Sequence, residues 1–545
     1  MKRLKYIILI FIVSSILLEA KFDDDYYLKL NKSFEIFGEV YRKLSENYVM
    51  EIDPELLMEE GIQGMLLGLD PYTSFYSESE SDDIDIITDG SYVGIGITIS
   101  YMDSMLTVIG IRDGYSAQKS GLRIGDRIYM ADTTVVLNKT SDEFRKFTRG
   151  KPGTFLDLKV LRDGIKDTFS FRIERQEIKV KNVTISTILS DSVGYIKVDR
   201  FSRFTDQEIR SALYELKQNK NLKSLILDLR DNPGGLLEAA ISTCEIFIPQ
   251  NNVIVSTKGR NENEIRTYRT IIQPVDTVIP LAVLINEGSA SASEIVAGAI
   301  QDLDRGIIIG QKSFGKGLVQ SVYNLPYNSA IKITTSKYYI PSGRCIQKLN
   351  FEKGRNKGLN LHYDSVYYTR NGRPVLESNG IIPDSIIKSE EPSQFIIDLL
   401  NKNIIFKFAN IFSTNYDKVP ELPNETLLKS FRDYINSINY KYQSELEARL
   451  DTLYQIVSKE NYNKKLQKDL MDFAKRIKKE QKDIIAENTE ELIKILTKEI
   501  RSRFVSEEQI SREQLNNDII LKTSISLLEK KNYNKILNIK SLTQN

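Results

Sequence analysis

Two short apolar runs constrain the fold of this chain more than any other feature. Residues 224–229 read S-L-I-L-D-L, and residues 280–285 read P-L-A-V-L-I. Nearly uninterrupted apolar runs of this length suit strands that are buried on both faces of a sheet. Each run is followed by a glycine-containing turn and then by a helical pattern. The middle of the chain, residues 176–388, is therefore predicted to be an α/β domain.

The chain has 545 residues, more than one hydrophobic core usually organises, so several domains are expected. Residues 89–175 alternate β-type runs with glycine turns, which indicates a separate β domain. The Arg162-Asp163-Gly164 tripeptide is typical of a hairpin turn. Strands are predicted in this domain at 93–100, 106–111, 127–130, 156–161 and 168–173.

Helical patterns flank these two domains. Residues 21–88 are acidic, and Asp53 followed by Pro54 predicts a helix start with an apolar face behind it, formed by Leu56, Leu57, Ile62, Met65, Leu66 and Leu69. Residues 389–545 are rich in Lys, Glu, Asn and Gln at helical spacing, and Ser506 with Gln509 resembles a capping box. We interpret this tail as a charged, solvated helical extension.

The first residues predict export. A basic segment, residues 1–5, precedes an apolar run of 13 residues from Tyr6 to Leu18. This is the pattern of a secretory signal within residues 1–20, and it is short for a membrane span. The cleavage site is poor, because Leu18 stands two positions before Ala20, where a small residue is expected. An uncleaved N-terminal membrane anchor is therefore the alternative.

Composition excludes some classes of function. Lys plus Arg total 75 and Asp plus Glu total 74, which gives no sign of a nucleic-acid-binding surface. The single histidine, His362, and the two cysteines, Cys244 and Cys345, are too few for a structural zinc site. A Ser-His-Asp triad would have to use His362, which lies in a polar stretch. Sequence distance does not decide whether the two cysteines pair.

The stretch 286–300 reads N-E-G-S-A-S-A-S-E-I-V-A-G-A-I and is the densest candidate for chemistry. An apolar strand leads through small residues into a helix, whose N-terminal N–H groups could stabilise an oxyanion beside a serine hydroxyl. The structural alternative is specific, because residues 291–294 also fit the capping box S-x-x-E. Residue chemistry alone does not choose among Ser289, Ser291 and Ser293.

The stretch 310–320, G-Q-K-S-F-G-K-G-L-V-Q, nearly matches a nucleotide-binding P-loop. Gly317 stands where that motif needs Ser or Thr, and the residues that follow suit a strand, so a nucleotide site is not predicted. Lys316 could act as a base only if it were neutral. A lysine in water has a pKa of about 10.4, and a lysine base needs about 7–8, a difference of roughly 4 kcal/mol that burial must supply.

The backbone N–H groups of two glycine-containing segments could donate to an oxyanion or to a carboxylate. Residues 228–236, D-L-R-D-N-P-G-G-L, expose amides after a buried strand and could donate to an oxyanion, although a plain turn explains them equally. Residues 92–97, Y-V-G-I-G-I, could aim N–H groups at a peptide carboxylate beside a strand edge. A β domain with ordinary turn glycines is the alternative.

Taken in order, these motifs resemble the C-terminal processing peptidases, peptidase family S41, over residues 30 to 388. The resemblance also rests on four further motifs: L-D-P-Y at 69–72, G-L-x-x-G-D at 121–126, Y-I-P-S-G-R at 339–344 and G-I-I-P-D at 380–384. It implies a ClpP/crotonase-like α/β protease core at 176–388 and an inserted PDZ domain at 89–175. The helical patterns add an N-terminal helical segment at 21–88 and a helical C-terminal extension at 389–545. Residues 349–378 look like an insertion, and the extension carries no motif that matches the catalytic family.

The resemblance also assigns roles to residues that spacing left open. It makes Ser291 the nucleophile, Lys316 the general base and Gln320 the residue that assists the lysine. The N–H groups of Ala292 and Gly235 would form the oxyanion hole. The PDZ carboxylate loop would be Gly94, Ile95, Gly96 and Ile97, and Arg149 is a candidate regulatory arginine.

The expected function is cleavage of exported proteins near their C-termini by a serine endopeptidase of the periplasm or cell envelope, without metal or organic cofactor. The expected partners are protein substrates bound through their C-termini, and not nucleic acid. Membrane attachment through the N-terminal segment and assembly into a homo-oligomer stay open. The alternative function is a catalytically inactive, PDZ-based binding or scaffold protein on the same fold.

Overall fold

The computed structural model describes residues 2–80, 88, 90–261, 265–348, 365–377, 379–388, 392–421, 423–460, 462–480 and 483–539. The chain divides into two units, and each is described on its own. The smaller comprises Met1–Glu78, Gln320–Thr334 and Asn350–Gly358, and the larger comprises Ser79–Val319, Thr335–Leu349 and Leu359–Asn545. His362 lies outside the described residues.

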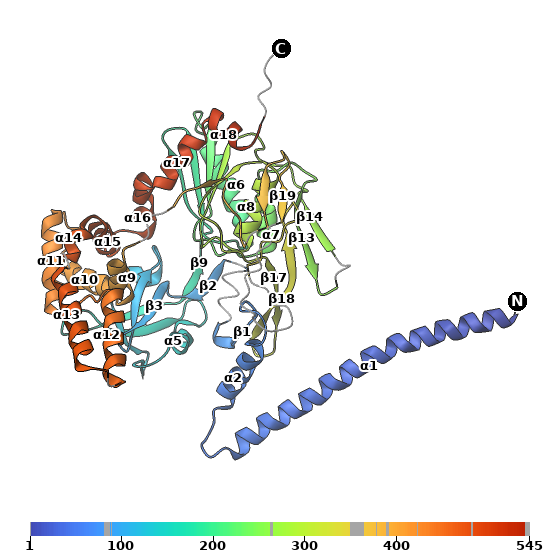
Figure 1. The fold of residues 1–545 in the computed structure, drawn as a ribbon, viewed down its shortest axis with the longest axis horizontal. Helices are drawn as coiled ribbons and strands as arrows, with labels where there is room; N and C mark the ends of the chain where they lie inside the picture. Colours follow the sequence, from blue (N-terminus) through green and yellow to red (C-terminus); the bar gives the residue numbers. More distant parts are fainter. Residues whose placement is uncertain are drawn as a thin grey trace, which may run out of the picture. The chain divides into compact units, whose positions relative to one another are not determined.

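The smaller unit begins with two helices, α1 (Lys2–Asn47) and α2 (Pro54–Leu66), both labelled in Figure 1. The predicted start of α2 is confirmed, because the Asp53 carboxylate accepts a hydrogen bond of 2.9 Å from the Glu55 N–H. The apolar face predicted behind it is not buried: no residue of α2 is buried, and Leu56 is 55% exposed. Among the residues that the structure describes, no helix combines the length and the apolar character that a membrane crossing needs.

The smaller unit also contains strand pairing. Strand β1 (Ser74–Tyr76) pairs antiparallel with the first residues of β18 (Ala330–Tyr339), in the register Ser74 opposite Lys332. Strand β17 (Leu318–Asn324) pairs with β18 as well. The strand predicted after Lys316 is therefore present, and a P-loop would instead open a helix there.

The larger unit contains the domain that the sequence predicts to be a PDZ domain. Its sheet runs in the order β3 (Ile97–Met102), β4 (Met105–Ile111), β5 (Arg127–Ala131), β7 (Phe155–Leu161) and β8 (Thr168–Glu174), with β6 (Thr134–Val135) beside β5. Strand β2 (Ser91–Gly94) pairs with β9 (Gln176–Lys179), and helices α4 (Ser116–Lys119) and α5 (Ser141–Thr148) complete the domain. Apolar side chains such as Leu106, Ile128 and Phe144 are fully buried in its core.

One PDZ strand prediction is wrong. The run at 93–100 is not one strand, because β2 ends at Gly94 and β3 begins at Ile97. Gly96 between them has φ +82°, a left-handed conformation that interrupts a strand and that glycine adopts readily. Ile95 turns into the domain core and is 1% exposed. The other four predicted strands are present as β4, β5, β7 and β8.

The predicted peptidase core is built on a six-stranded sheet. Its order is β10 (Val183–Leu189), β11 (Val193–Val198), β12 (Ser224–Asp228), β15 (Leu281–Ile285), β16 (Ile307–Gly310) and β21 (Ser385–Ile386), all parallel except β10. The two apolar runs are the central strands β12 and β15, and every residue of both is buried. This confirms the α/β prediction.

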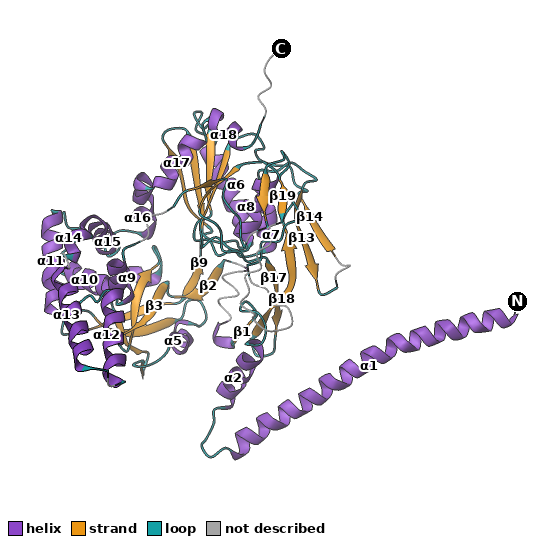
Figure 2. Cartoon of the chain, viewed as in Figure 1, coloured by secondary structure: helices purple, strands orange, loops and turns teal. Residues whose placement is uncertain are grey.

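Apolar side chains of the central strands alternate between two buried clusters. Leu225 and Leu227 of β12 belong to the cluster that also holds residues of α6 (Thr205–Leu216), α7 (Leu237–Cys244) and α8 (Ala292–Asp302). Ile226, between them, belongs to a second cluster with residues of α17 (Ile519–Leu527) and α18 (Lys530–Ile536). Figure 2 shows helices on both sides of this sheet. The end of the chain therefore covers one face of the peptidase sheet.

Two smaller β structures flank the core in the larger unit. Strand β13 (Val253–Gly259) pairs with β14 (Ile265–Arg269) and with the last residues of β18. Part of the predicted insertion forms the hairpin β19 (Val366–Tyr368) and β20 (Pro374–Leu376). Arg373 of this hairpin pairs with Asp304 and Asp384 at 2.6 and 2.5 Å, which fixes the hairpin to the core.

The interpretation of residues 389–545 as a solvated extension is wrong. Helices of this segment enclose a core of their own, in which Phe395, Phe408 and Phe431 are at most 3% exposed. The helices are α9 (Gln394–Asn401), α10 (Ile404–Ser413), α11 (Asn424–Ser437), α12 (Glu445–Lys459), α13 (Lys464–Glu480), α14 (Ile484–Glu487), α15 (Thr489–Arg501) and α16 (Glu507–Gln514), followed by α17 and α18. The domain also contacts the PDZ domain, where Lys407 pairs with Asp103 at 2.6 Å.

Candidate active site

The turn from β15 into α8 has the conformation of a presented nucleophile. Ser291, immediately before α8, has φ +54° and ψ −113°, a combination that side-chain-bearing residues rarely adopt. A strained strand-to-helix turn of this kind lifts a hydroxyl out of the chain, as in the nucleophile elbows of hydrolases. Ala292 is the first helical residue, and the first N–H groups of a helix have no partner within it.

Burial separates the three serines that the sequence left open. Ser289 and Ser293 are 0% exposed, and Ser291 is partly exposed. The Ser289 hydroxyl donates to the Leu229 carbonyl at 2.7 Å, and the Ser293 hydroxyl donates to the Asn232 carbonyl at 2.9 Å. Two of the three hydroxyls therefore hold neighbouring loops together, and Ser291 alone is open to a substrate.

Glu294 joins the serine turn to the loop that carries Lys316. Its carboxylate is fully buried and accepts four hydrogen bonds. Its Oε2 accepts from the Ser291 N–H at 2.8 Å and the Lys316 N–H at 2.9 Å, and its Oε1 accepts from the Ser313 hydroxyl at 2.6 Å and the Gly315 N–H at 2.7 Å. Burial raises the pKa of the Glu294 carboxyl, and the four donors oppose that effect. The backbones of Ser291 and Lys316 are thus held by one side chain.

The capping-box reading of Glu294 was therefore incomplete. The local bond to the Ser291 N–H is present, as the S-x-x-E pattern predicts. The three remaining bonds reach Ser313, Gly315 and Lys316, and no local pattern indicates them. The sequence contains one signal for these contacts: Glu294 begins a helix and has no charged neighbour in sequence.

The glycine loop after β12 packs directly against the serine turn. A Cβ atom on Gly234 would lie 2.8 Å from the Ser291 Cβ and 3.0 Å from the Ala292 nitrogen, so only glycine fits there. Asn232, fully buried, fixes the loop, because its side-chain amide donates to the Val198 carbonyl and its backbone carbonyl accepts from the Ala290 N–H at 3.0 Å. The loop amides are held beside the start of α8.

Strand-like bonds hold the other side of this loop. Gly235 has φ +146° and forms a parallel bridge with Phe201. The Phe201 N–H donates to the Gly234 carbonyl at 2.9 Å, and the Leu236 N–H donates to the Phe201 carbonyl at 2.8 Å. The Gly234 N–H is engaged by the Asn232 side chain at 2.9 Å.

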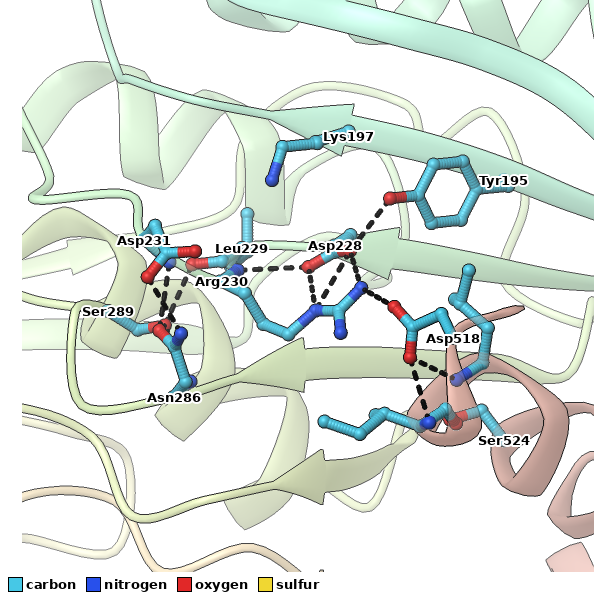
Figure 3. A network of polar contacts seen from close by, with 12 residues as sticks. Tyr195, Lys197, Asp228, Leu229, Arg230, Asp231, Asn286, Ser289, Asp518 and Ser524 are labelled. Carbon is cyan, nitrogen blue, oxygen red and sulfur yellow. Dashed lines mark hydrogen bonds and ion pairs between the residues drawn. The ribbon is translucent and has the colours of Figure 1, made fainter. Parts of the chain in front are cut away.

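A buried ion network anchors the base of the same loop (Figure 3). Arg230 lies between two carboxylates: its Nη2 is 2.5 Å from Asp228 Oδ2 and 2.7 Å from Asp518 Oδ2. The Tyr195 hydroxyl donates to Asp228 at 2.7 Å. Burial would raise the pKa of Asp228, but the charge and hydrogen bonds of Arg230, with Lys197, hold that pKa below its ordinary value.

Asp518 connects this network to the end of the chain. It is the N-cap of α17, and its Oδ1 accepts from the N–H groups of Ile520 and Leu521 at 2.8 and 3.1 Å. One carboxylate thus starts a C-terminal helix and pairs with the arginine two residues before Asn232. No sequence pattern indicated this contact, because its two partners lie in segments that are far apart in the chain.

Two further predicted site residues, Gln320 and Arg149, lie in the smaller unit and in the PDZ domain, and the two cysteines are not paired. Gln320 belongs to the smaller unit, where its amide donates to the Thr334 hydroxyl at 3.4 Å and that hydroxyl donates to Asp70 at 3.0 Å. Arg149 ends helix α5 of the PDZ domain, and its N–H donates to the Arg145 carbonyl at 3.1 Å. Cys244 and Cys345 are both free thiols.

The predicted carboxylate loop borders a groove of the PDZ domain. Gly94, Ile95, Gly96 and Ile97 line a cavity of about 330 Å³, together with residues of α5. This groove lies at the edge of β3, where a PDZ domain can add a peptide as a further strand.

Comparisons with known proteins agree with this architecture. The family models "PDZ domain", "Peptidase family S41" and "Probable PDZ-protease, C-terminal helical domain" match residues 93–173, 192–354 and 395–528. The last match gives the C-terminal helices a family that their sequence pattern did not reveal.

Three curated relatives extend the agreement. A carboxy-terminal-processing protease of Bartonella bacilliformis is 37% identical over 319 residues, which cover 58% of this chain and 73% of the relative. The carboxy-terminal processing protease CtpB of Bacillus subtilis is 32% identical, over 59% of this chain and 67% of the relative. A probable CtpA-like serine protease of Staphylococcus epidermidis is 30% identical, over 64% and 67%. The chain belongs to the carboxy-terminal-processing proteases of peptidase family S41, and it is a serine peptidase.

Proposed function

We propose that this peptidase cleaves exported proteins near their C-termini with Ser291 as nucleophile and Lys316 as general base. The observation that carries the proposal is the serine turn itself. Ser291 is the one partly exposed serine of the three, it is held in a strained conformation before α8, and Glu294 ties its backbone to that of Lys316. Those features suit a nucleophile and a general base whose backbones must keep a fixed position relative to each other.

The reaction balances with these groups alone. Neutral Lys316 takes the proton of the Ser291 hydroxyl while the serine oxygen bonds to the substrate carbonyl carbon. The N–H groups of Ala292 and Gly235 donate to the oxyanion that forms. Lys316 then gives its proton to the leaving amine as the C–N bond breaks, and water hydrolyses the acyl-enzyme to release a new C-terminus. Gln320 supports the lysine, and the Gly94–Ile97 loop receives the substrate carboxylate.

The test compares variants on a pool of unfolded proteins. Full-length enzyme is incubated with the pool, and mass spectrometry identifies the new C-termini that appear. Wild-type enzyme and the Lys312→Ala control, which changes an exposed lysine of the same loop, should produce the same cuts near the original ends. Ser291→Ala and Lys316→Ala should produce none. Cuts that persist in folded Ser291→Ala would refute the assignment.

We also propose that the enzyme works outside the cytoplasm, in the periplasm or cell envelope. The support is the basic segment of residues 1–5 followed by 13 apolar residues. A fusion of residues 1–47 to a reporter that folds only after export should be active. Loss of activity on replacing three apolar residues by arginine is expected, and activity that survives this change would contradict the proposal.

A further inference from the structure

The PDZ groove carries a concentration of positive charge that the proposed function does not use. Three arginines line it, Arg112 and Arg145 from the PDZ domain and Arg200 from the peptidase core, and no Asp or Glu is among the lining residues. Arg200 lies two residues after the end of β11 and so belongs to the peptidase core rather than to the PDZ fold. Clustered guanidinium groups beside backbone amides favour anions.

Arg200 has an unused hydrogen-bond donor. Its Nε is buried and has no partner among the described residues. Burial lowers the pKa of Arg200, and the neighbouring charge of Arg112 lowers it further, whereas Asp199 opposes this. Asp199 itself lies 3.6 Å from the Lys197 amine. Such a donor gains from a charged acceptor, because it has given up its hydrogen bonds to water without replacing them.

Arg112 is fixed beside the carboxylate loop. Its N–H donates to the Gly96 carbonyl at 2.9 Å, so its backbone is bonded to the middle of the Gly94–Ile97 segment. Gly96 has φ +82°, and a Cβ there would meet the Tyr115 side chain at 3.0 Å, so the loop backbone stays close to its surroundings. The two arginines therefore belong to the same pocket as the loop amides.

The backbone next to Arg200 is fixed by the peptidase core. The N–H of Phe201 donates to the Gly234 carbonyl at 2.9 Å, and the Leu236 N–H donates to the Phe201 carbonyl at 2.8 Å. These bonds anchor the chain beside Arg200 to the glycine loop. A ligand of Arg200 in the groove would touch the PDZ domain and the peptidase core at once.

We propose that Arg200, together with Arg112, binds the terminal carboxylate of the substrate, so that PDZ domain and peptidase core hold the substrate end jointly. The inference rests on the proposed function, which supplies a substrate C-terminus as ligand. It adds a specificity residue outside the PDZ fold. A C-terminal amide, or an internal peptide segment, would leave both arginines without their acceptor.

The test measures binding without cleavage, in the full chain carrying Ser291→Ala. The probe is a fluorescent peptide pool with four randomised C-terminal residues, made once as free acid and once as C-terminal amide. The free-acid pool should bind more tightly than the amide pool. Adding Arg200→Gln should weaken binding of the free acid by roughly ten- to hundred-fold, the range for a charge-assisted bond, and leave the amide unchanged.

Three further variants sharpen the result. Arg203→Gln changes the same charge on an exposed neighbour that does not line the groove, and it should keep the full preference for the acid. Arg200→Lys should keep part of the preference, and Arg112→Gln should lose part. An acid-to-amide ratio that Arg200→Gln leaves unchanged would overturn the inference. A ratio of one in the parent chain would instead overturn the recognition of C-termini on which it rests.

Discussion

Replacing Gly235 by alanine should displace the proposed oxyanion donor of the glycine loop. A Cβ at this position would lie 1.9 Å from the Phe201 carbonyl oxygen, with φ at +146°. Real contacts of this kind are rarely shorter than 3.0 Å, so the loop must move by about 1.1 Å (3.0 less 1.9). The obstacle is backbone, which cannot rotate away as a side chain can.

The expected magnitude follows from the donor that is displaced. Loss of a single oxyanion-hole donor costs about 100- to 1,000-fold in kcat, or about 2.7–4 kcal/mol. The change acts on the transition state, so KM should stay within a few-fold. The assay is steady-state cleavage of a fluorogenic peptide, with thermal unfolding to establish that the variant is folded.

A matched glycine separates this effect from backbone strain. Gly153 has φ +84° and nothing within 4 Å of an added Cβ. Gly153→Ala should therefore lower stability by about 1–2 kcal/mol, the cost of a left-handed residue, and leave kcat unchanged. The reasoning is refuted if folded Gly235→Ala keeps kcat within five-fold of wild type, or if Gly153→Ala loses as much.

Further variants test the two networks around the site. Glu294→Gln replaces one carboxylate oxygen by an NH2 group, so at least one N–H group loses its acceptor and faces a donor. We expect kcat to fall at least 100-fold and the free energy of unfolding, measured by urea titration, to fall by about 2–4 kcal/mol; unchanged kcat would contradict the role of this carboxylate. Asp518→Asn keeps a good N-cap but removes the pair with Arg230, so the unfolding free energy should fall by about 1 kcal/mol, whereas no change would mean that the pair is energetically silent. The pKa of Asp228 is lowered in the folded chain, so the stability that its carboxylate contributes is complete above about pH 3.9 and is lost as pH falls through the folded pKa. The difference in Tm between wild type and Asp228→Asn should therefore be constant at neutral pH and vanish in strong acid. A difference that grows on acidification would contradict this sign.

The sequence predicted the elements whose patterns are local. The two apolar runs became the central strands because alternate residues of each enter opposite clusters, which is what an uninterrupted apolar run requires. The Asp53 cap and four of the five PDZ strands were predicted correctly because their patterns are local as well. The fifth was misread, since Gly96 looked like a strand residue and in fact breaks the strand.

The contacts that organise the site were beyond sequence reasoning. Residue chemistry left three serines open, and the family resemblance chose Ser291; the structure adds that the other two hydroxyls are buried and bonded to carbonyls. Glu294 looked like a local cap, although three of its four bonds reach another loop. Such contacts depend on how distant segments meet, which no spacing records.

The C-terminal helices show the same limit on a larger scale. Their charged composition suggested solvated helices, because each short helix has only a few apolar positions. Together these positions close a core, and the last helices cover a face of the peptidase sheet. Asp518 then meets Arg230 at 2.7 Å. Composition averaged over the segment concealed this packing.

The central claim, that Ser291 is a nucleophile activated by Lys316, is tested most directly by covalent labelling. A fluorophosphonate probe is added to wild type, Lys316→Ala and Lys312→Ala, and the modified residue and labelling rate are read by mass spectrometry. The label should appear on Ser291 in wild type and Lys312→Ala at equal rates, and Lys316→Ala should react at least 100-fold more slowly. Labelling of another serine, or an unchanged rate in folded Lys316→Ala, would contradict the claim.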